Sequence, residues 1–199
     1  PMTSLNPLKT IGDQIMEAVE LHQHLKGKAA REKTLEYLRD VGIADPEVRF
    51  AQYPHEFSGG MRQRVVIAIA VACNPQILIC DEPTTALDVT VQKQVIKLLN
   101  DLQAKLGFAM IFVSHDLALV AEVGSEITVM YAGQVIEQAP TVELLTNPIH
   151  EYTRGLLGSV LSIEEGAKDG TRLHQVPGSV PSPEDFPRGD RFAPRSSHP

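Results

Sequence analysis

The fold follows from two stretches of the sequence, ILICDE at residues 77–82 and FSGGMRQR at residues 57–64. The first is a short apolar run that ends in two carboxylates, an arrangement suited to holding Mg²⁺ and orienting a water beside a phosphate chain. The second is a Ser-Gly-Gly turn that opens a helix, and such a turn presents backbone N–H groups to an anion. Together they predict a site for phosphate chemistry.

These stretches resemble the Walker B and signature motifs of the ATP-binding-cassette (ABC) ATPases. The sequence PTTALD at residues 83–88 resembles the family's D-loop. The sequence SHD at residues 114–116, after a β-type run at 109–113, resembles the segment of its switch histidine. Between these motifs, apolar residues recur at helical spacing and predict one helix: Val91, Val95, Leu98, Leu102 and Leu106.

The resemblance implies an α/β fold of the P-loop NTPase (RecA-like) class, the nucleotide-binding domain of ABC proteins. Residues 1–52 would be the remainder of the helical subdomain, with a helical pattern from about residue 11 to residue 50. Residues 53–140 would hold the signature motif and the second half of the RecA-like core, where strands and helices alternate. A hairpin is expected over residues 126–137.

Residues 141–199 would form a C-terminal extension of the oligopeptide-importer type. Two short helices are expected there, at about residues 142–145 and 151–161. Beyond Ser162 the composition turns to Pro, Gly, Ser and charge. Such a composition predicts a partly extended tail that is ordered only where it finds a surface to lie against.

One motif of the family is missing from the sequence, the Gly-x-x-x-x-Gly-Lys-Ser/Thr loop that cradles phosphates. The only Gly-Lys pair, Gly27-Lys28, is followed by Ala29, and His22 stands at the position of the earlier glycine. The opening PMTSLNP resembles the residues just after the family's Q-loop glutamine. We therefore expect a C-terminal fragment of a longer subunit, one that binds nucleotide weakly and hydrolyses little by itself.

The resemblance also implies a role for each acidic or histidine residue of the motifs. Asp81 is expected to hold Mg²⁺ through a water, and Glu82 to orient or activate the attacking water. A neighbouring carboxylate and partial burial are expected to raise the pKa of Glu82. His115 is expected to reach the γ-phosphate. Asp88 is expected to bridge to the opposite subunit or to cap the helix that follows it, and both roles can hold.

The signature residues Ser58, Gly59, Gly60 and Met61 are expected to act on a second subunit. In the ABC family two subunits pair head to tail, and each signature motif closes on the ATP held by the other. A serine hydroxyl, glycine N–H groups and the positive end of a helix starting near Met61 all suit a phosphate. Gly60→Asp is expected to place a like charge against the γ-phosphate and prevent dimer closure, while the monomer still folds.

Further stretches narrow the resemblance to importers of oligopeptides and dipeptides: YPHEF at residues 53–57, NPIHEYT at 147–153 and GDRFAPRS at 189–196. Many relatives carry cysteines where Asp190 and Ser196 stand, and in some of them these ligate an iron–sulfur cluster. Because Asp and Ser cannot replace those thiolates, no cluster is predicted. Cys73 and Cys80 lie in apolar segments and are expected to be buried, reduced thiols, which fits the cytosol.

The formal net charge of −7 over 199 residues disfavours a nucleic-acid surface. The longest apolar stretch, residues 65–73, is far shorter than the ~20 residues of a membrane span. The resemblance therefore implies a peripheral protein at the cytoplasmic face of the cell membrane that uses ATP and Mg²⁺. Its partners would be a second ABC ATPase subunit, identical or different, the permease subunits and, indirectly, an extracytoplasmic peptide-binding protein, with no nucleic acid.

Three functions compete at this point. An ABC ATPase of DNA maintenance would show long heptad repeats ahead of the signature, whereas about forty residues of helical pattern without such repeats precede Tyr53. A non-enzymatic partner would carry a degenerate site, but Asp81, Glu82 and His115 are all present. The third function is the ATPase of an importer. Its cargo would be a dipeptide, an oligopeptide or a metal complex such as nickel, because the binding protein and the permease select the cargo.

Overall fold

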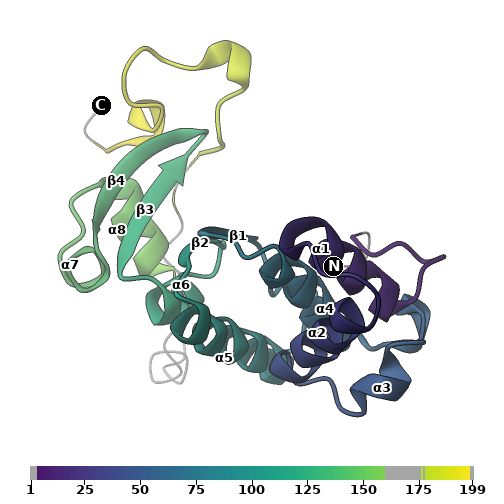
Figure 1. Ribbon diagram of the computed structural model, residues 1–199. Helices are drawn as coiled ribbons and strands as arrows, with labels where there is room; N and C mark the ends of the chain where they lie inside the picture. The colour runs from purple at the N-terminus through teal and green to yellow at the C-terminus, as the bar shows by residue number, and fades with distance from the viewer. Residues whose placement is uncertain (1–3, 160–175, 177, 198–199) are drawn as a thin grey trace. The chain divides into compact units, whose positions relative to one another are not determined.

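The computed structural model describes residues 4–159, 176 and 178–197. The chain packs as two compact units, Pro1–Ser114 and His115–Pro199 (Figure 1). Across the described ranges, every helix is too short or too polar to span a lipid bilayer. The assignment of residues 1–52, 53–140 and 141–199 to parts of the family's fold stays a prediction.

The first unit begins with helices, as the sequence predicts. Helix α1 spans Ile11–Gln23, α2 spans Gly27–Asp40, the short α3 spans Pro46–Arg49 and α4 spans Gly59–Ala72. A single 3-10 turn, Pro54–Glu56, separates α3 from α4. Backbone N–H groups just past the end of α2 donate hydrogen bonds back to its last carbonyls, which closes the helix at Asp40.

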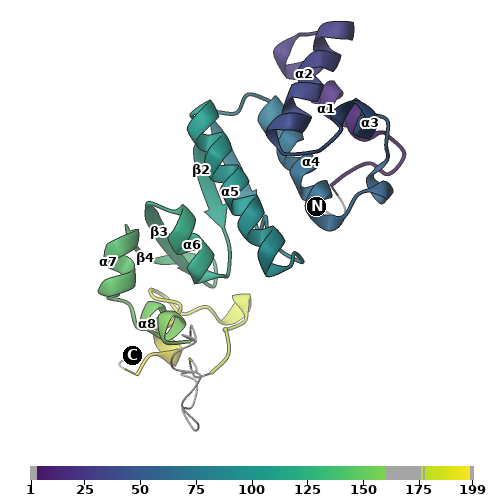
Figure 2. The ribbon, with the colours of Figure 1, turned by 90° about the horizontal axis from the view of Figure 1, so that it is seen from below.

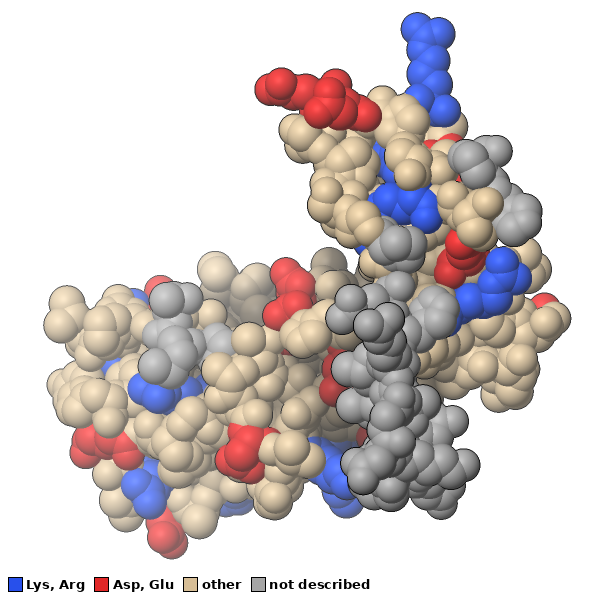
Figure 3. All heavy atoms as spheres, turned by 180° about the vertical axis from the view of Figure 1, so that it is seen from behind, with Lys and Arg blue, Asp and Glu red and all other residues tan. Residues whose placement is uncertain are grey.

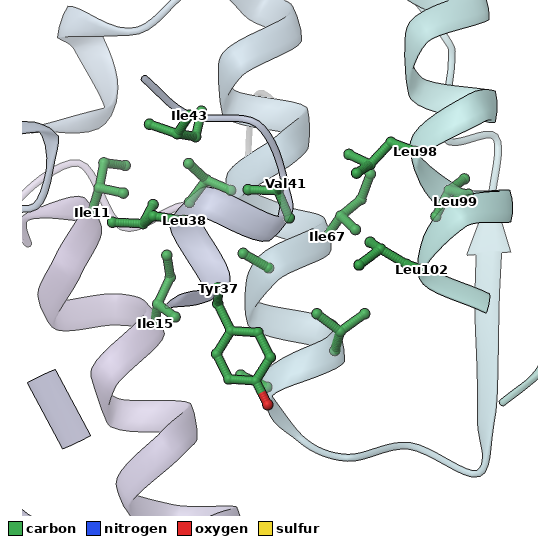
Figure 4. Packing of buried hydrophobic residues seen from close by; sticks show 14 of the residues in the cluster. Ile11, Ile15, Tyr37, Leu38, Val41, Ile43, Ile67, Leu98, Leu99 and Leu102 are labelled. Carbon is green, nitrogen blue, oxygen red and sulfur yellow. The ribbon is translucent and has the colours of Figure 1, made fainter. Parts of the chain in front are cut away.

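One hydrophobic core holds these helices together with α5, Val89–Leu106. Figure 4 shows side chains of α1, α2 and α5 converging on α4. Each large aliphatic side chain that is fully buried contributes roughly 1.5–3 kcal/mol. The fully buried members of this core include Ile11, Ile15, Leu38, Val65, Val71 and Leu99.

Two parallel strands complete the first unit. Strand β1 spans Ile77–Asp81 and β2 spans Ala109–Val113, and Asp81 is the register partner of Val113. Helix α5 connects them, since parallel strands need a crossover of this kind. Figure 2 shows α5 lying along β2. The predicted strand at residues 109–113 and the predicted helix after residue 88 are both confirmed.

The two faces of this sheet differ. Leu78 and Cys80 point into the core, whereas the alternate side chains of both strands lie outside it. Within the part of the chain that the structure describes, these outward side chains are between 45% and 67% exposed: Ile77, Ile79, Ile111 and Val113. Parallel sheets are normally covered on both faces, so one apolar face of this sheet has no cover among the described residues.

The second unit is built on a β-hairpin. Helix α6, Leu117–Val123, leads into β3, Glu126–Tyr131, which pairs antiparallel with β4, Gln134–Pro140. The connecting residues Ala132 and Gly133 both have positive φ, +47° and +78°, as a tight hairpin turn requires. The predicted hairpin is confirmed, and its second strand continues to Pro140, past the expected end at residue 137.

Two short helices follow the hairpin, α7 at Thr141–Thr146 and α8 at Glu151–Gly158. Both were predicted; residues 160 and 161, at the expected end of the second helix, lie outside the described residues. A small core joins β3, β4, α7 and α8 around Leu144. The C-terminal segment contains the 3-10 turns Pro183–Asp185 and Ala193–Arg195.

The burial of the two cysteines agrees only partly with the prediction. Cys80 is buried in β1, and burial raises the pKa of its thiol to about 11. Cys73 is only half-buried because it lies at the end of α4, although burial raises the pKa of its thiol as well. On the face drawn in Figure 3, acidic and basic side chains are interspersed among uncharged ones, unlike the basic surfaces that bind nucleic acid.

Candidate functional site

The acidic pair lies at the carboxyl edge of the two-stranded sheet. Strand β1 ends at Asp81, and the N–H of Glu82 donates a 2.9 Å hydrogen bond to the carbonyl oxygen of Val113 at the end of β2. Ligands of open parallel sheets bind at this edge. The carboxylate of Asp81 is exposed and makes no hydrogen bond or ion pair with the described residues. It is therefore available to a ligand.

The turn after β1 holds Glu82 in an unusual conformation. Glu82 has φ +44° and Ala86 has φ +63°, the left-handed region that non-glycine residues rarely adopt. The hydroxyl of Thr85 donates a 2.7 Å hydrogen bond to Oε2 of Glu82, which fixes the carboxylate within this turn. Backbone strain of this kind costs about 1–3 kcal/mol per residue and tends to persist at functional sites.

The Ser-Gly-Gly turn opens helix α4. Ser58 is the N-cap, and its Oγ accepts a 3.3 Å hydrogen bond from the N–H of Met61. The helix begins at Gly59, two residues before the expected start near Met61, because the cap sets the first turn at Ser58. The N–H groups of Gly59 and Gly60 belong to that first turn and have no intrahelical partner. They can donate to an anion, and the Ser58 hydroxyl can donate as well.

Helix α5 starts beside the first turn of α4. Asp88 caps α5, since its Oδ1 accepts a 2.9 Å hydrogen bond from the N–H of Val91. The cap is confirmed, and the bridge of Asp88 to another subunit stays a prediction. A Cβ atom at Gly60 would lie 2.6 Å from Cγ1 of Val91. A side chain in Gly60→Asp would therefore strike Val91 of its own chain and lower stability as well. The expectation that dimer closure fails while the monomer still folds stays a prediction.

His115 comes two residues after Val113 in the chain and begins the second unit. Asp116 then caps α6, because its Oδ1 accepts hydrogen bonds from Ala118 N at 3.0 Å and Leu119 N at 3.3 Å. The segment thus links strand β2 to helix α6, which Asp116 caps. The contact of His115 with phosphate stays a prediction, and so does the raised pKa of Glu82.

The described residues suit a metal ion that arrives with a ligand. Over residues 4–159, 176 and 178–197, no group of three or more His, Cys, Asp or Glu side chains could hold a metal ion. Mg²⁺ is commonly bound through one or two carboxylates together with substrate phosphates and waters. The exposed carboxylate of Asp81 fits that pattern, which needs no complete cage of protein ligands.

In the C-terminal extension, Asp190 and Ser196 both make polar contacts near the start of α8. Nε2 of His150 lies 3.2 Å from Oδ2 of Asp190, and the hydroxyl of Ser196 donates a 2.6 Å hydrogen bond to Oε2 of Glu151. These side chains therefore fix the extension to α8 by hydrogen bonds. The absence of an iron–sulfur cluster stays a prediction.

Two residues of the site were not singled out from the sequence. Thr85 orients Glu82, and Arg64 of α4 donates hydrogen bonds to the end of α2 and to α5. Both lie inside the quoted motifs, but motif membership alone does not reveal their contacts. The bonds of Arg64 join residues 23 and 30 positions apart, which no local pattern reports.

The chain resembles known protein families along most of its length. Residues 2–85 match the family described as ABC transporter. Residues 136–198 match the family described as Oligopeptide/dipeptide transporter, C-terminal region. The first match contains the signature turn and the acidic pair, and the second contains most of the hairpin's second strand and the segment with Asp190 and Ser196.

Relatives share about half of the residues. A probable peptide ABC transporter ATP-binding protein of Sinorhizobium fredii is 51% identical over 195 residues, 98% of this chain and 58% of the relative. The oligopeptide transport ATP-binding proteins AppD and OppD of Bacillus subtilis are each 50% identical. They are matched over 98% and 100% of this chain and over 58% and 55% of their own lengths. The chain thus spans less than two thirds of the curated relatives that it matches.

A solved structure also resembles the chain. It is the ATP-binding cassette MJ0796, solved as a dimer in a post-hydrolysis state bound to ADP and Pi, with a TM-score of 0.60 and 30% identity. The likeness covers 69% of this chain and 59% of that one. The predicted fold class, an α/β ABC nucleotide-binding domain, is confirmed by this likeness.

Proposed function

Since the chain belongs to the ABC transporter family, we propose that it is part of the ATP-hydrolysing subunit of a peptide importer. The observation that carries the peptide assignment is the match of residues 136–198 to the C-terminal region of oligopeptide and dipeptide transporters. The ATP-binding cassette alone would not distinguish the cargo, because one fold serves many functions. The whole subunit would couple ATP hydrolysis to transport across the membrane.

The acidic edge of the sheet is the proposed catalytic centre. Asp81 would hold Mg²⁺ through a water, with the phosphates of ATP supplying other ligands. The bound ion would neutralise charge on the phosphates. Glu82 would orient or activate the attacking water, and the hydrogen bond from Thr85 supports this role because it fixes the carboxylate. His115 would contact the γ-phosphate.

The first turn of α4 is proposed to bind the nucleotide of a second ATPase subunit, identical or different. Ser58, Gly59, Gly60 and Met61 would face that nucleotide, and Asp88 would contact the opposing subunit. The support is the N-terminal geometry of a 14-residue helix, with first-turn N–H groups and the helix dipole directed at an anion. Each subunit would therefore complete the site of the other.

The remaining partners are proposed from the same assignment. Permease subunits would receive the conformational change at the cytoplasmic face of the cell membrane, and an extracytoplasmic binding protein would deliver the peptide. The curated relatives are longer than this chain. We propose that, in the whole subunit, a further segment covers the exposed sheet face formed by Ile77, Ile79, Ile111 and Val113, because a parallel sheet is stable when both faces are buried.

A reconstituted transporter tests the assignment. The whole subunit is assembled with its permease and binding protein in lipid vesicles, and ATP hydrolysis and uptake of labelled peptides are measured together. We expect di- or oligopeptides to stimulate hydrolysis and to be transported. Stimulation by nickel complexes instead of peptides would replace peptide by metal complex as the cargo. Stimulation by DNA in the absence of permease would refute the importer assignment.

A further inference from the structure

One guanidinium group joins three helices of the first unit. Nη1 of Arg64, on α4, donates a 2.7 Å hydrogen bond to the carbonyl oxygen of Val41 at the end of α2. Nη2 of the same side chain donates a 3.2 Å hydrogen bond to Oε1 of Gln94 on α5. The planar fork of arginine reaches both acceptors at once, which the single ammonium of lysine cannot do in the same geometry.

The acceptor on α2 is built to receive this side chain. Val41 is the C-cap of α2, where unpaired carbonyl groups carry partial negative charge and favour a cation. Gly42 follows with φ +72°, and a Cβ atom there would lie 2.7 Å from Nη1 of Arg64. Residue 42 is therefore glycine for two reasons: the left-handed backbone, and the space that the guanidinium occupies.

A second contact between α4 and α5 lies one turn closer to the proposed site. Gly60 packs directly against Val91, and Arg64 and Gln94 stand about one helical turn further along the same two helices. Two contacts spaced along a helix pair fix both the separation and the rotation of the helices. The two helices are capped by Ser58 and Asp88, residues proposed to face the opposing subunit.

We propose that Arg64 is a positioning residue of the ATPase, which makes the end of α2 and the first turns of α4 and α5 move as one body. This inference rests on the proposed function, in which the signature turn must close on the nucleotide of the other subunit. Arg64 acts through α4 and α5 and does not touch the nucleotide. Its loss therefore lowers turnover and leaves ATP binding to a single subunit unchanged.

Hydrogen exchange of the whole subunit tests the coupling without any activity. The amides to follow are Val41, Gly42 and Ile43 after α2, Arg62 in α4 and Gln92 in α5, all of which are hydrogen-bonded to backbone carbonyls. In Arg64→Ala, the amides at all three places (after α2, in α4 and in α5) should exchange about tenfold faster or more. This is the change expected when charge-assisted hydrogen bonds are lost. Lys93→Ala, an exposed change beside Gln94, should exchange like the wild type.

Faster exchange confined to residues 41–43 would overturn the proposal, because Arg64 would then only cap α2. If Arg64→Ala does not fold, Arg64→Lys replaces it in the exchange experiment. Lysine keeps a positive charge for the Val41 carbonyl but lacks the second nitrogen that bonds Gln94. Faster exchange of the Gln92 amide, with the protection of residues 41–43 retained, would therefore support the coupling. Unchanged exchange at Gln92 in Arg64→Lys would overturn it.

ATP hydrolysis by the assembled transporter is the second test of the proposal. Arg64→Ala should lower kcat about tenfold, with the ATP affinity of the isolated subunit unchanged and Lys93→Ala matching the wild type. A wild-type kcat in Arg64→Ala, or a weakened ATP affinity of the isolated subunit, would overturn the positioning role. A wild-type transporter without ATPase activity would instead refute the proposed function, and the exchange experiment would still report on the coupling.

Discussion

A Cβ atom at Gly60 would lie 2.6 Å from Cγ1 of Val91, whereas one at Gly59 would meet nothing nearer than Cδ2 of Leu87 at 3.7 Å. Gly60→Ala should therefore lower the free energy of unfolding by about 1–3 kcal/mol through overpacking. Gly59→Ala is the matched control and should be neutral or slightly stabilising, since alanine favours the helix. Urea denaturation of the purified subunit measures both.

The same contact predicts a rescue. Val91→Ala removes the methyl groups that an alanine at residue 60 would strike, so the double variant Gly60→Ala/Val91→Ala should be more stable than Gly60→Ala alone. The two changes should thus be strongly non-additive, as expected for residues in direct contact. Additive losses in the double variant would show that the cost at residue 60 comes from somewhere other than Val91.

Glu82 and Thr85 make separate predictions for the proposed reaction. Glu82→Gln in the whole subunit should retain ATP binding and lower turnover by roughly 10²–10⁴-fold, the usual contribution of a general base. Thr85→Val removes the hydroxyl that donates to Glu82 and should lower kcat by a smaller factor, about tenfold. Thr90→Val, an exposed change on α5, is the control. Hydrolysis near the normal rate in Glu82→Gln would remove Glu82 from its assigned role.

Much of the fold is predictable from side-chain periodicity, because periodicity reports burial on one face. The helix after Asp88 places Val95, Leu98 and Leu102 in the core, as its spacing indicates. The hairpin strand β3 alternates between buried and exposed positions along Glu126–Tyr131. Helix α4 is different: the stretch 65–73 is apolar on every side, since α1, α2 and α5 all pack against it. Its orientation therefore cannot be read from periodicity.

The motifs predict which residues form the candidate site, but not how they are held. The acidic pair was expected at the end of an apolar run, and the structure places it at the end of a strand because β1 stops at Asp81. The positive φ of Glu82 and the bond from Thr85 depend on a turn closed by several backbone contacts. The packing of Gly60 against Val91 depends on how two helices distant in sequence meet. Such tertiary relationships leave no local pattern.

Phe192 anchors the C-terminal segment to the second unit. It is 1% exposed and lies edge-on to Tyr131, with ring centroids 5.3 Å apart and an interplanar angle of 90°. Phe192→Ala should lower the free energy of unfolding by about 3–5 kcal/mol. It should also speed tryptic cleavage after Arg195, whose guanidinium bonds to the carbonyl oxygens of Val176 and Gly178.

Phe186→Ala is the matched control for Phe192. Phe186 is only half-buried, with the guanidinium of Arg191 4.1 Å from its ring centroid. Its removal should cost much less stability than the loss of Phe192, because it removes far less buried apolar surface. Thermal unfolding and the time course of trypsin digestion compare the two variants. Equal effects would mean that the segment is not held mainly by Phe192.

The carboxylate of Glu137 should make the stability of the second unit depend on pH. Its carboxylate accepts hydrogen bonds from Ile149 N at 2.7 Å and His150 N at 3.0 Å. Burial raises the pKa of this carboxyl, but the hydrogen bonds outweigh burial and hold the pKa below its ordinary value of 4.5. A carboxylate with a pKa lowered by folding contributes stability above its unfolded pKa, and this contribution is lost as the pH falls through the folded pKa.

Glu137→Gln should therefore melt at a lower temperature than the wild type at pH 7, because the amide accepts through one oxygen and carries no charge. The difference in Tm should shrink as the pH falls below 4.5 and the wild-type carboxylate takes up its proton. Glu143→Gln, an exposed change on α7, should follow the wild type throughout. A Tm difference for Glu137→Gln that stays constant from pH 7 down to about pH 3 would show that the charge of Glu137 contributes nothing to the stability of the second unit.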